Sequence, residues 1–324
     1  MAESSSTDFL DVESLLSEDE RLVRRTARQF VDDRVLPVIR HHYRDGTFPR
    51  ELAKEMAELG FFGANLEGYG CAGMSDVEYG LLMQELERGD SGVRSFVSVQ
   101  SSLAMFAIWR FGSEEQKQRW LPAMAKGEAI GCFGLTEPNF GSNPGGMTTR
   151  AKLDEDGFVL NGEKTWITNG SIADVAVVWA KYGDTDEVRG FLVEKGAPGF
   201  TASDLHNKMS MRASITSSLA FADCALPAEA ALPGAIGLKA PLACLNNARL
   251  GIGWGAIGAA SACYEEARRY TLERTQFAGK PIASHQLVQS ELAWMITEIS
   301  KAQLLAMHVS RLKERGKLHH THVS

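Results

Sequence analysis

Two segments in the middle of the chain carry residue types that could hold a flat ligand with a polar edge. The first spans residues 132–143, CFGLTEPNFGSN, and has the composition of a strand that runs into a loop rich in glycine and hydroxyl side chains. Such a loop offers backbone N–H groups and a Ser or Thr hydroxyl to a ligand. By itself the segment fits an ordinary strand and turn equally well.

The second segment spans residues 161–169, NGEKTWITN, where Asn161-Gly162 predicts a hairpin turn ahead of a strand that carries Trp166 and Thr168. A Trp beside a hydroxyl residue suits a flat heteroaromatic ring, which needs an apolar face and a few hydrogen bonds at its edge. The alternative is a Trp in the hydrophobic core, which is the more common situation for a lone Trp.

Composition and charge argue against several other kinds of protein. The chain has 324 residues, 44% hydrophobic and 23% charged, which is typical of a globular protein of two or three domains. A net charge of −7, without long basic runs, argues against a nucleic-acid or membrane partner. The acidic, Ser-rich N-terminus lacks the features of a signal or transit peptide, so we predict a cytoplasmic location.

Cysteine and histidine patterns indicate no metal site. The five cysteines are scattered and form no CxxC pair, so they suggest neither a disulfide framework nor a zinc site. His319, His320 and His322 have no further ligand types beside them, and we interpret them as a frayed helix end.

The order of elements predicts an α+β multidomain protein. Residues 1–128 read as an N-terminal helical domain, with capping-box patterns at residues 17–20, 75–78 and 113–116 and a first helix that should end or kink at Pro37. Residues 129–233 read as a middle antiparallel β domain, with strands at 174–182 and 188–194 and turns at 156–157, 161–162 and 169–170.

Residues 234–324 read as an incomplete C-terminal helical bundle. Residues 248–264 are dense in Gly and Ala, which lets two helix backbones approach closely; a dinucleotide-binding loop is the alternative, but no strand precedes the run. A last helix is expected from Gln286 to about Arg315. Two helices cannot enclose a core alone, so they must pack on the N-terminal helices, on another subunit or on further chain.

Taken together, the two central segments resemble the flavin-binding strands of the acyl-CoA dehydrogenase family, whose helical, β and helical domains follow the same order. The resemblance extends to Arg274-Thr275-Gln276-Phe277 and to Gln286, which lies one residue further along than in the commonest family spacing. Asn143 also departs from the family, which usually has Asp at that position.

The resemblance implies FAD as cofactor, an acyl-CoA as substrate and electron-transfer flavoprotein as electron acceptor. In the family a base removes the α-proton of the thioester while the β-hydrogen leaves as hydride to the flavin. Residues implied to contact the cofactor are Phe133, Leu135, Thr136, Gly141, Ser142, Trp166, Ile167 and Thr168. Across an interface of the family's homotetramer, Arg274, Phe277 and Gln286 are implied to reach the FAD of a neighbouring subunit.

Three segments resemble the glutaryl-CoA dehydrogenase branch, which serves amino-acid catabolism and decarboxylates its product to crotonyl-CoA. They are residues 87–102, 208–214 and 245–249. In that branch an Arg at the position of Arg94 binds the terminal carboxylate, which a guanidinium can contact with two hydrogen bonds; the alternative is a surface salt bridge. The implied substrate-binding residues are Glu87, Arg94, Ser95, Ser142, Leu245, Asn246 and Arg249.

No residue of the chain matches a catalytic base of this family. The usual Glu, in a Tyr-Glu-Gly-Thr-like motif, would lie beyond Ser324. A minority branch of the family carries the Glu instead on the helix that here includes Ala248, which is not a carboxylate. Glu137 and Glu87 are carboxylates near the predicted pocket, but neither matches a known base position. We therefore expect a C-terminally truncated chain that binds more readily than it turns over; a non-catalytic flavin or acyl-CoA binder and a poorly folded fragment are the alternatives.

Overall fold

Residues 8–323 are described in the computed structural model, where they fall into two units that interleave along the chain. The helical unit combines residues up to 37 with residues 75–91 and the chain from 250 onward. The β unit combines residues 38–74 with residues 92–249. Within the described range, no helix has the length and apolar character needed to cross a bilayer.

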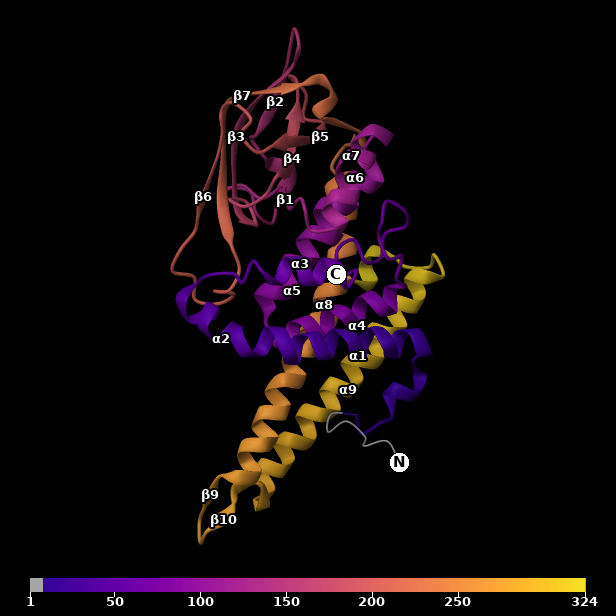
Figure 1. Cartoon of the computed structure of the whole chain (residues 1–324), viewed down its shortest axis with the longest axis vertical. Helices are drawn as coiled ribbons and strands as arrows, with labels where there is room; N and C mark the ends of the chain where they lie inside the picture. The colour runs from indigo at the N-terminus through magenta and orange to yellow at the C-terminus, as the bar shows by residue number, and fades with distance from the viewer. Residues whose placement is uncertain (1–7, 324) are drawn as a thin grey trace. The chain divides into compact units, whose positions relative to one another are not determined.

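Four long helices build the helical unit. They are α1 (Glu18–Phe30), α4 (Asp76–Gly89), the part of α8 (Lys239–Glu273) that follows residue 249, and α9 (Gln286–Glu314). A hairpin of β9 (Thr275–Gln276) and β10 (Lys280–Pro281), then a 3-10 turn (Ile282–Ser284), joins α8 to α9 (Figure 1). Shorter 3-10 turns lie at Val12–Leu15 and His320–His322.

Local capping signals were predicted correctly. Ser17, Ser75 and Ser113 each form a complete capping box at the start of α1, α4 and α7 (Glu114–Ala125). Pro37 was predicted to end or kink the first helix, and it does not end it. A π-helical turn, Val31–Val35, precedes the proline and α2 (Leu36–Asp45) runs through it, because the wider turn accommodates a residue that has no N–H.

The Gly- and Ala-rich run of α8 packs against α4, as the close-approach interpretation predicts. A Cβ at Gly258 would lie 1.9 Å from the backbone oxygen of Gln84, and a Cβ at Gly80 would lie 2.2 Å from the indole nitrogen of Trp254. The Trp254 indole is fully buried and donates a hydrogen bond of 3.0 Å to Ser310 Oγ on α9. Glycine is therefore required where these backbones meet.

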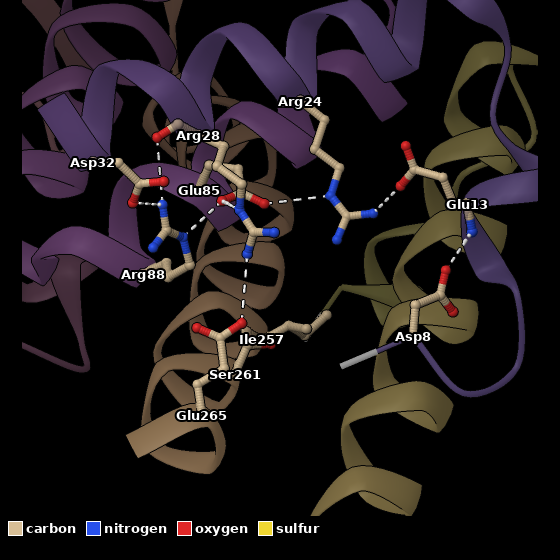
Figure 2. A network of polar contacts seen from close by, with 10 residues as sticks. All are labelled: Asp8, Glu13, Arg24, Arg28, Asp32, Glu85, Arg88, Ile257, Ser261 and Glu265. Atoms are coloured by element: carbon tan, nitrogen blue, oxygen red, sulfur yellow. Dashed lines mark hydrogen bonds and ion pairs between the residues drawn. The ribbon is translucent and has the colours of Figure 1, made fainter. Parts of the chain in front are cut away.

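A charged network ties α1 to α4 beside this contact. The Glu85 side chain is 1% exposed and accepts hydrogen bonds from the Nε atoms of Arg24, Arg28 and Arg88 at 3.3, 3.2 and 2.8 Å (Figure 2). Arg88 also bonds Asp32, at 2.6 Å. Three guanidinium groups thus surround one buried carboxylate, whose removal would leave the largely buried Arg24 and Arg88 without one of their counter-ions.

The last helix is partly covered. Lys313 pairs with Asp76 at 2.5 Å and Glu314 accepts from the Val77 backbone N–H at 3.1 Å, so α9 packs on α4. Near its start, Leu287 and Trp294 remain 84% and 62% exposed. Of the alternatives left open by the sequence, packing on the N-terminal helices therefore accounts for the end of α9 but not for its beginning.

The β unit contains one sheet and several short helices. The helices are the remainder of α2, α3 (Leu52–Glu58), α5 (Ser91–Ser98), a π-helical segment (Val99–Met105), α6 (Phe106–Phe111), α7 and the start of α8. The strands are β1 (Gly131–Gly134), β2 (Arg150–Asp154), β3 (Gly157–Thr168), β4 (Val175–Tyr182), β5 (Val188–Glu194), β6 (Phe200–Asp204), β7 (Thr216–Pro227) and β8 (Ala231–Ile236). Figure 1 shows this sheet in magenta and orange.

Most pairs of the sheet are antiparallel, as predicted for this domain, but two parallel pairs make the sheet mixed. Its order is β6-β7-β3-β2-β4-β5-β8, with β1 added beside β4. Both β1 and β2 pair with β4 in parallel, and the other pairs are antiparallel. Parallel pairing needs a long connection, which the loop and strands between β1 and β4 provide.

The hairpin turn predicted at Asn161-Gly162 is also wrong. β3 runs unbroken through both residues, and its pairing with β7 shifts register between Leu160 and Gly162. Gly162 has φ +140°, and a Cβ there would lie 2.5 Å from Thr149 Oγ1. The glycine is used for a β-bulge and a close backbone approach rather than for a turn.

Candidate functional site

A cavity of about 320 Å³ opens in the β unit at the end of β1. Four pieces of chain meet there: the loop after β1, the end of β3, the π-helical segment and the start of α8. The lining residues are Val99, Leu103, Phe133, Leu135, Thr136, Gly141, Ser142, Pro144, Trp166, Ile167, Thr168, Leu242, Leu245 and Arg249.

The loop after β1 is folded back on itself so that it meets the cavity twice. The backbone N–H of Thr165 donates to the carbonyl of Thr136 at 2.9 Å, which holds the loop along β3. Glu137 and Phe140 then exchange backbone hydrogen bonds of 3.3 and 3.1 Å, which closes a tight turn. The chain therefore supplies Thr136 to the cavity before the turn and Ser142 after it.

A buried ion pair lies behind this loop. Lys164 Nζ is 2.9 Å from a carboxylate oxygen of Glu137, and the two side chains are 0% and 2% exposed. Burial alone would raise the pKa of Glu137, but the Lys164 ammonium and the donors of Thr148 and Thr149 outweigh it and hold this pKa well below its usual range. Burial also lowers the pKa of Lys164, against the effect of Glu137. A carboxylate held so firmly in its charged form is a poor acceptor for a substrate proton.

The end of β3 contains an irregularity that gives the cavity its aromatic face. Successive side chains of a regular strand point to opposite faces of a sheet. The pairing of β3 with β7 shifts register between Lys164 and Ile167, and Trp166 has φ +60°. As a result Trp166, Ile167 and Thr168 all line one cavity, although they are consecutive. Trp166 is 64% exposed, whereas Ile167 is buried in the core.

Residues at helical spacing form one wall of the cavity. Leu242, Leu245 and Arg249 are three and four residues apart on α8, so they share one helix face. Arg249 is exposed and donates to Asn246 Oδ1 at 2.8 Å. Val99 and Leu103, four residues apart on the π-helical segment, extend the apolar wall.

The chemical character of the cavity is therefore specific. One aromatic face, several aliphatic walls, the hydroxyl groups of Thr136, Ser142 and Thr168 and one guanidinium meet there, and none of the described lining residues is a carboxylate. Trp166 and Thr168 also line an adjoining hollow of about 380 Å³, whose other wall is the segment 208–216. The two hollows together accept a flat, elongated ligand with a polar edge.

The structure brings most of the residues singled out from the sequence to this cavity. Ten of them line it: Phe133, Leu135, Thr136, Gly141, Ser142, Trp166, Ile167, Thr168, Leu245 and Arg249. Arg94 and Ser95, on α5, and Asn246, on α8, belong to the same unit but not to the lining. Glu87, Arg274, Phe277 and Gln286 belong to the helical unit, where the last three are exposed.

Some lining and supporting residues were missed from the sequence. Leu242 precedes Leu245 by three residues, and helical periodicity alone could have added it. Val99 lies inside the segment 87–102 that contains Arg94, and Leu103 follows that segment directly, at helical spacing from Val99. Lys164 lies in the same segment as Trp166 and Thr168, and nothing in its neighbourhood along the chain points to Glu137.

Comparisons with known proteins match every part of this arrangement to one family. Models of the acyl-CoA dehydrogenase N-terminal, middle and C-terminal domains match residues 17–128, 132–224 and 236–324. The short-chain specific acyl-CoA dehydrogenase of Rattus norvegicus mitochondria is 35% identical over 308 residues, which cover 93% of this chain and 74% of that protein.

Solved structures agree in fold. A glutaryl-CoA dehydrogenase from Mycobacterium smegmatis, in complex with FADH2, superposes with a TM-score of 0.94 at 53% identity, over 97% of this chain and 80% of the other. A structure described as the electron transferring flavoprotein of Acidaminococcus fermentans matches with a TM-score of 0.90 at 35% identity, over 95% of this chain and 82% of the other.

Proposed function

Because this chain belongs to the acyl-CoA dehydrogenase family, we propose that it takes part in the FAD-dependent α,β-dehydrogenation of an acyl-CoA thioester. The observation that carries the proposal is the cavity of the β unit, where an exposed indole, three hydroxyl groups and apolar walls converge. Family membership alone would not single out these residues; their convergence on one cavity supports them as the site.

The residues present fit the isoalloxazine ring of FAD. Trp166 offers an aromatic surface that the bulge of β3 holds out of the core. Thr136, Ser142 and Thr168 offer hydrogen bonds to a polar edge. Gly141 leaves space, because a Cβ there would meet no heavy atom within 4 Å among the described residues. The chemistry that FAD supplies when bound is the two-electron oxidation of the substrate.

The chain's own residues would then bind the cofactor and the acyl-CoA, orient them, and remove water from around them. The aliphatic walls exclude water from the reacting carbons, which strengthens every electrostatic interaction inside the cavity. Arg249 adds a positive charge at the start of α8, where it would attract an anionic acyl-CoA. The hydroxyl groups fix the orientation of the bound groups.

Among possible acyl groups we propose glutaryl. Arg94 is 8% exposed in α5, and a site for purely apolar chains would gain nothing from burying a guanidinium there. Glu87, Ser95, Leu245 and Asn246 complete the set that resembles the glutaryl branch. Similarity to the Mycobacterium smegmatis enzyme supports this substrate, whereas similarity to short-chain specific relatives favours a short monocarboxylic acyl group.

The test uses the purified 324-residue chain loaded with FAD. Glutaryl-CoA and butyryl-CoA are titrated without oxygen while the flavin absorbance is recorded, and turnover is followed with an artificial electron acceptor. Binding of glutaryl-CoA at lower concentration than butyryl-CoA supports the proposed substrate. The reverse order assigns the chain to the short-chain group, and failure to retain FAD would refute the proposed function.

A second function is favoured by one observation, the lack of a carboxylate among the described residues that line the cavity. Glu137 lies close behind, but Lys164 and two threonines occupy its oxygens. Such a site would bind FAD and acyl-CoA without removing the α-proton, and a positioned general base contributes about 10²–10⁴-fold to rate. Perturbation of the flavin spectrum by acyl-CoA without reduction supports this reading, and reduction at an ordinary enzymatic rate refutes it.

We further propose the assembly and context implied by the family. Electron-transfer flavoprotein would accept the electrons, and a homotetramer would bring Arg274, Phe277 and Gln286 to the FAD of a neighbouring subunit. The exposure of all three residues leaves them available for this role. Domain limits at residues 128 and 233, a cytoplasmic location and a role in amino-acid catabolism stay predictions of the same kind.

A further inference from the structure

The ion pair of Glu137 and Lys164 has no place in the binding of FAD or acyl-CoA described above, because neither residue lines the cavity. Both side chains are nevertheless buried, one at the start of the loop after β1 and the other inside β3. We infer that this pair is a positioning device, which fixes the loop of residues 135–142 so that its hydroxyl groups meet the cavity. Its consequence for FAD rests on the proposed function.

The Glu137 carboxylate is saturated with donors. It accepts from the Thr148 backbone N–H at 2.7 Å, from the Thr148 hydroxyl at 2.9 Å, from the Thr149 backbone N–H at 2.9 Å and from Lys164 Nζ at 2.9 Å. These donors come from both sides of the loop, from the chain that leads into β2 and from β3. One side chain therefore determines where three segments stand relative to each other.

The Lys164 ammonium also fixes the backbone of the loop where the loop forms the cavity wall. It donates a second hydrogen bond, of 3.1 Å, to the carbonyl of Leu135. The next carbonyl, of Thr136, accepts from the Thr165 N–H at 2.9 Å. Two successive loop residues that line the cavity are thus held by two successive residues of β3, immediately before the bulge that presents Trp166.

Stability alone does not explain a charged pair at this place. Replacing a buried ion pair by apolar residues of similar volume is often neutral or stabilising. What the apolar replacement cannot reproduce is the direction of the bonds to the Leu135 carbonyl and to the Thr148 and Thr149 amides. The specific effect of the pair is therefore on loop geometry.

The test compares Lys164→Met, which leaves Glu137 without its counter-ion, with the double variant Glu137→Gln, Lys164→Met, which removes both charges. Hydrogen exchange of residues 134–143 is measured without FAD, and the FAD dissociation constant is measured by fluorescence titration. We expect the double variant to regain much of the unfolding free energy lost in the single variant. Its exchange in 134–143 should still be faster, and its FAD dissociation constant higher, each on the order of tenfold, equivalent to about 1.4 kcal/mol.

Leu226→Ala is the matched control, since Leu226 is a core residue of β7 paired with Phe158, remote from the loop. It should lower stability without selective loss of exchange protection in residues 134–143. Parent-like exchange in that segment of the double variant would overturn the inference. If the parent chain binds no FAD, the proposed function fails, while the exchange measurement still decides whether the pair fixes the loop.

Discussion

Gly258 on α8 offers the sharpest test of how the helical unit is packed. A Cβ at this position would lie 1.9 Å from the backbone oxygen of Gln84, 2.8 Å from its carbonyl carbon and 3.0 Å from the backbone nitrogen of Arg88. All three atoms belong to the backbone of α4, so no side chain can rotate away. Gly258→Ala therefore forces the two helices apart by about an ångström.

The expected magnitude follows from two opposing effects. Replacing Gly by Ala inside a helix is favourable by about 1 kcal/mol. Overpacking a close contact costs about 1–3 kcal/mol, and a rigid backbone contact belongs at the upper end of that range. We expect Gly258→Ala to lower the free energy of unfolding by about 2 kcal/mol, measured by urea denaturation followed by circular dichroism.

The control is Gly253→Ala on the same helix, where a Cβ would meet no heavy atom within 4 Å among the described residues. Only the propensity effect applies there, so this variant should be stabilised by about 0.5–1 kcal/mol. Opposite signs for the two variants are the prediction. A stabilised or neutral Gly258→Ala would show that α4 and α8 do not approach as closely as described, and the close-approach explanation of the glycine-rich run would be lost.

Four further variants test the proposed site and two buried ion-pair groups. Trp166→Ala should raise the FAD dissociation constant about three- to tenfold, because stacking on an aromatic face contributes about 0.5–1.5 kcal/mol; unchanged affinity would remove Trp166 from the cofactor site. Arg94→Gln should weaken glutaryl-CoA binding about tenfold or more, with FAD content and butyryl-CoA binding unchanged; equal glutaryl-CoA affinity would refute the substrate. Glu85→Gln should lower the free energy of unfolding in urea by about 3 kcal/mol, because three arginines lose their shared carboxylate; a loss under about 0.5 kcal/mol would mean that the network adds little. The pKa of Glu137 is lowered from 4.5 to about 2, so its contribution to stability is complete above pH 4.5 and disappears as the pH falls towards 2. In Glu137→Gln the free energy of unfolding should therefore depend less on pH between these two values than it does in the parent chain. The same pH dependence in both proteins would contradict this prediction.

Features set by neighbours along the chain could be predicted from the sequence. The capping boxes at Ser17, Ser75 and Ser113 need only a side chain and a backbone group three residues apart. The composition of their segments predicted the strands β4 and β5, and the glycine-rich run of α8 predicted a closely packed partner helix. The order of the domains followed from the pattern of elements, and the family resemblance added ten of the lining residues, which spacing alone would not have gathered.

Features that depend on pairing across the sheet could not be predicted in the same way. The same Asn-Gly dipeptide that closes hairpins elsewhere forms a bulge at Gly162, where Thr149, just before β2, approaches closely. The register shift before Ile167 has no local signal, yet it decides that Trp166 faces the cavity rather than the core.

The two irregular pairings and the buried ion pair act on the same short stretch of chain. Lys164 is the last regularly paired residue of β3 before the register shift, and its ammonium is bound to the neighbouring loop, which also lines the cavity. A shift by one residue at this point would move Lys164 out of reach of Glu137 and turn Trp166 to the other face. The ion pair therefore also specifies the register that the bulge requires. This coupling gives a physical reason for placing a buried lysine two residues from an exposed tryptophan, where composition alone would favour apolar residues inward and polar residues outward.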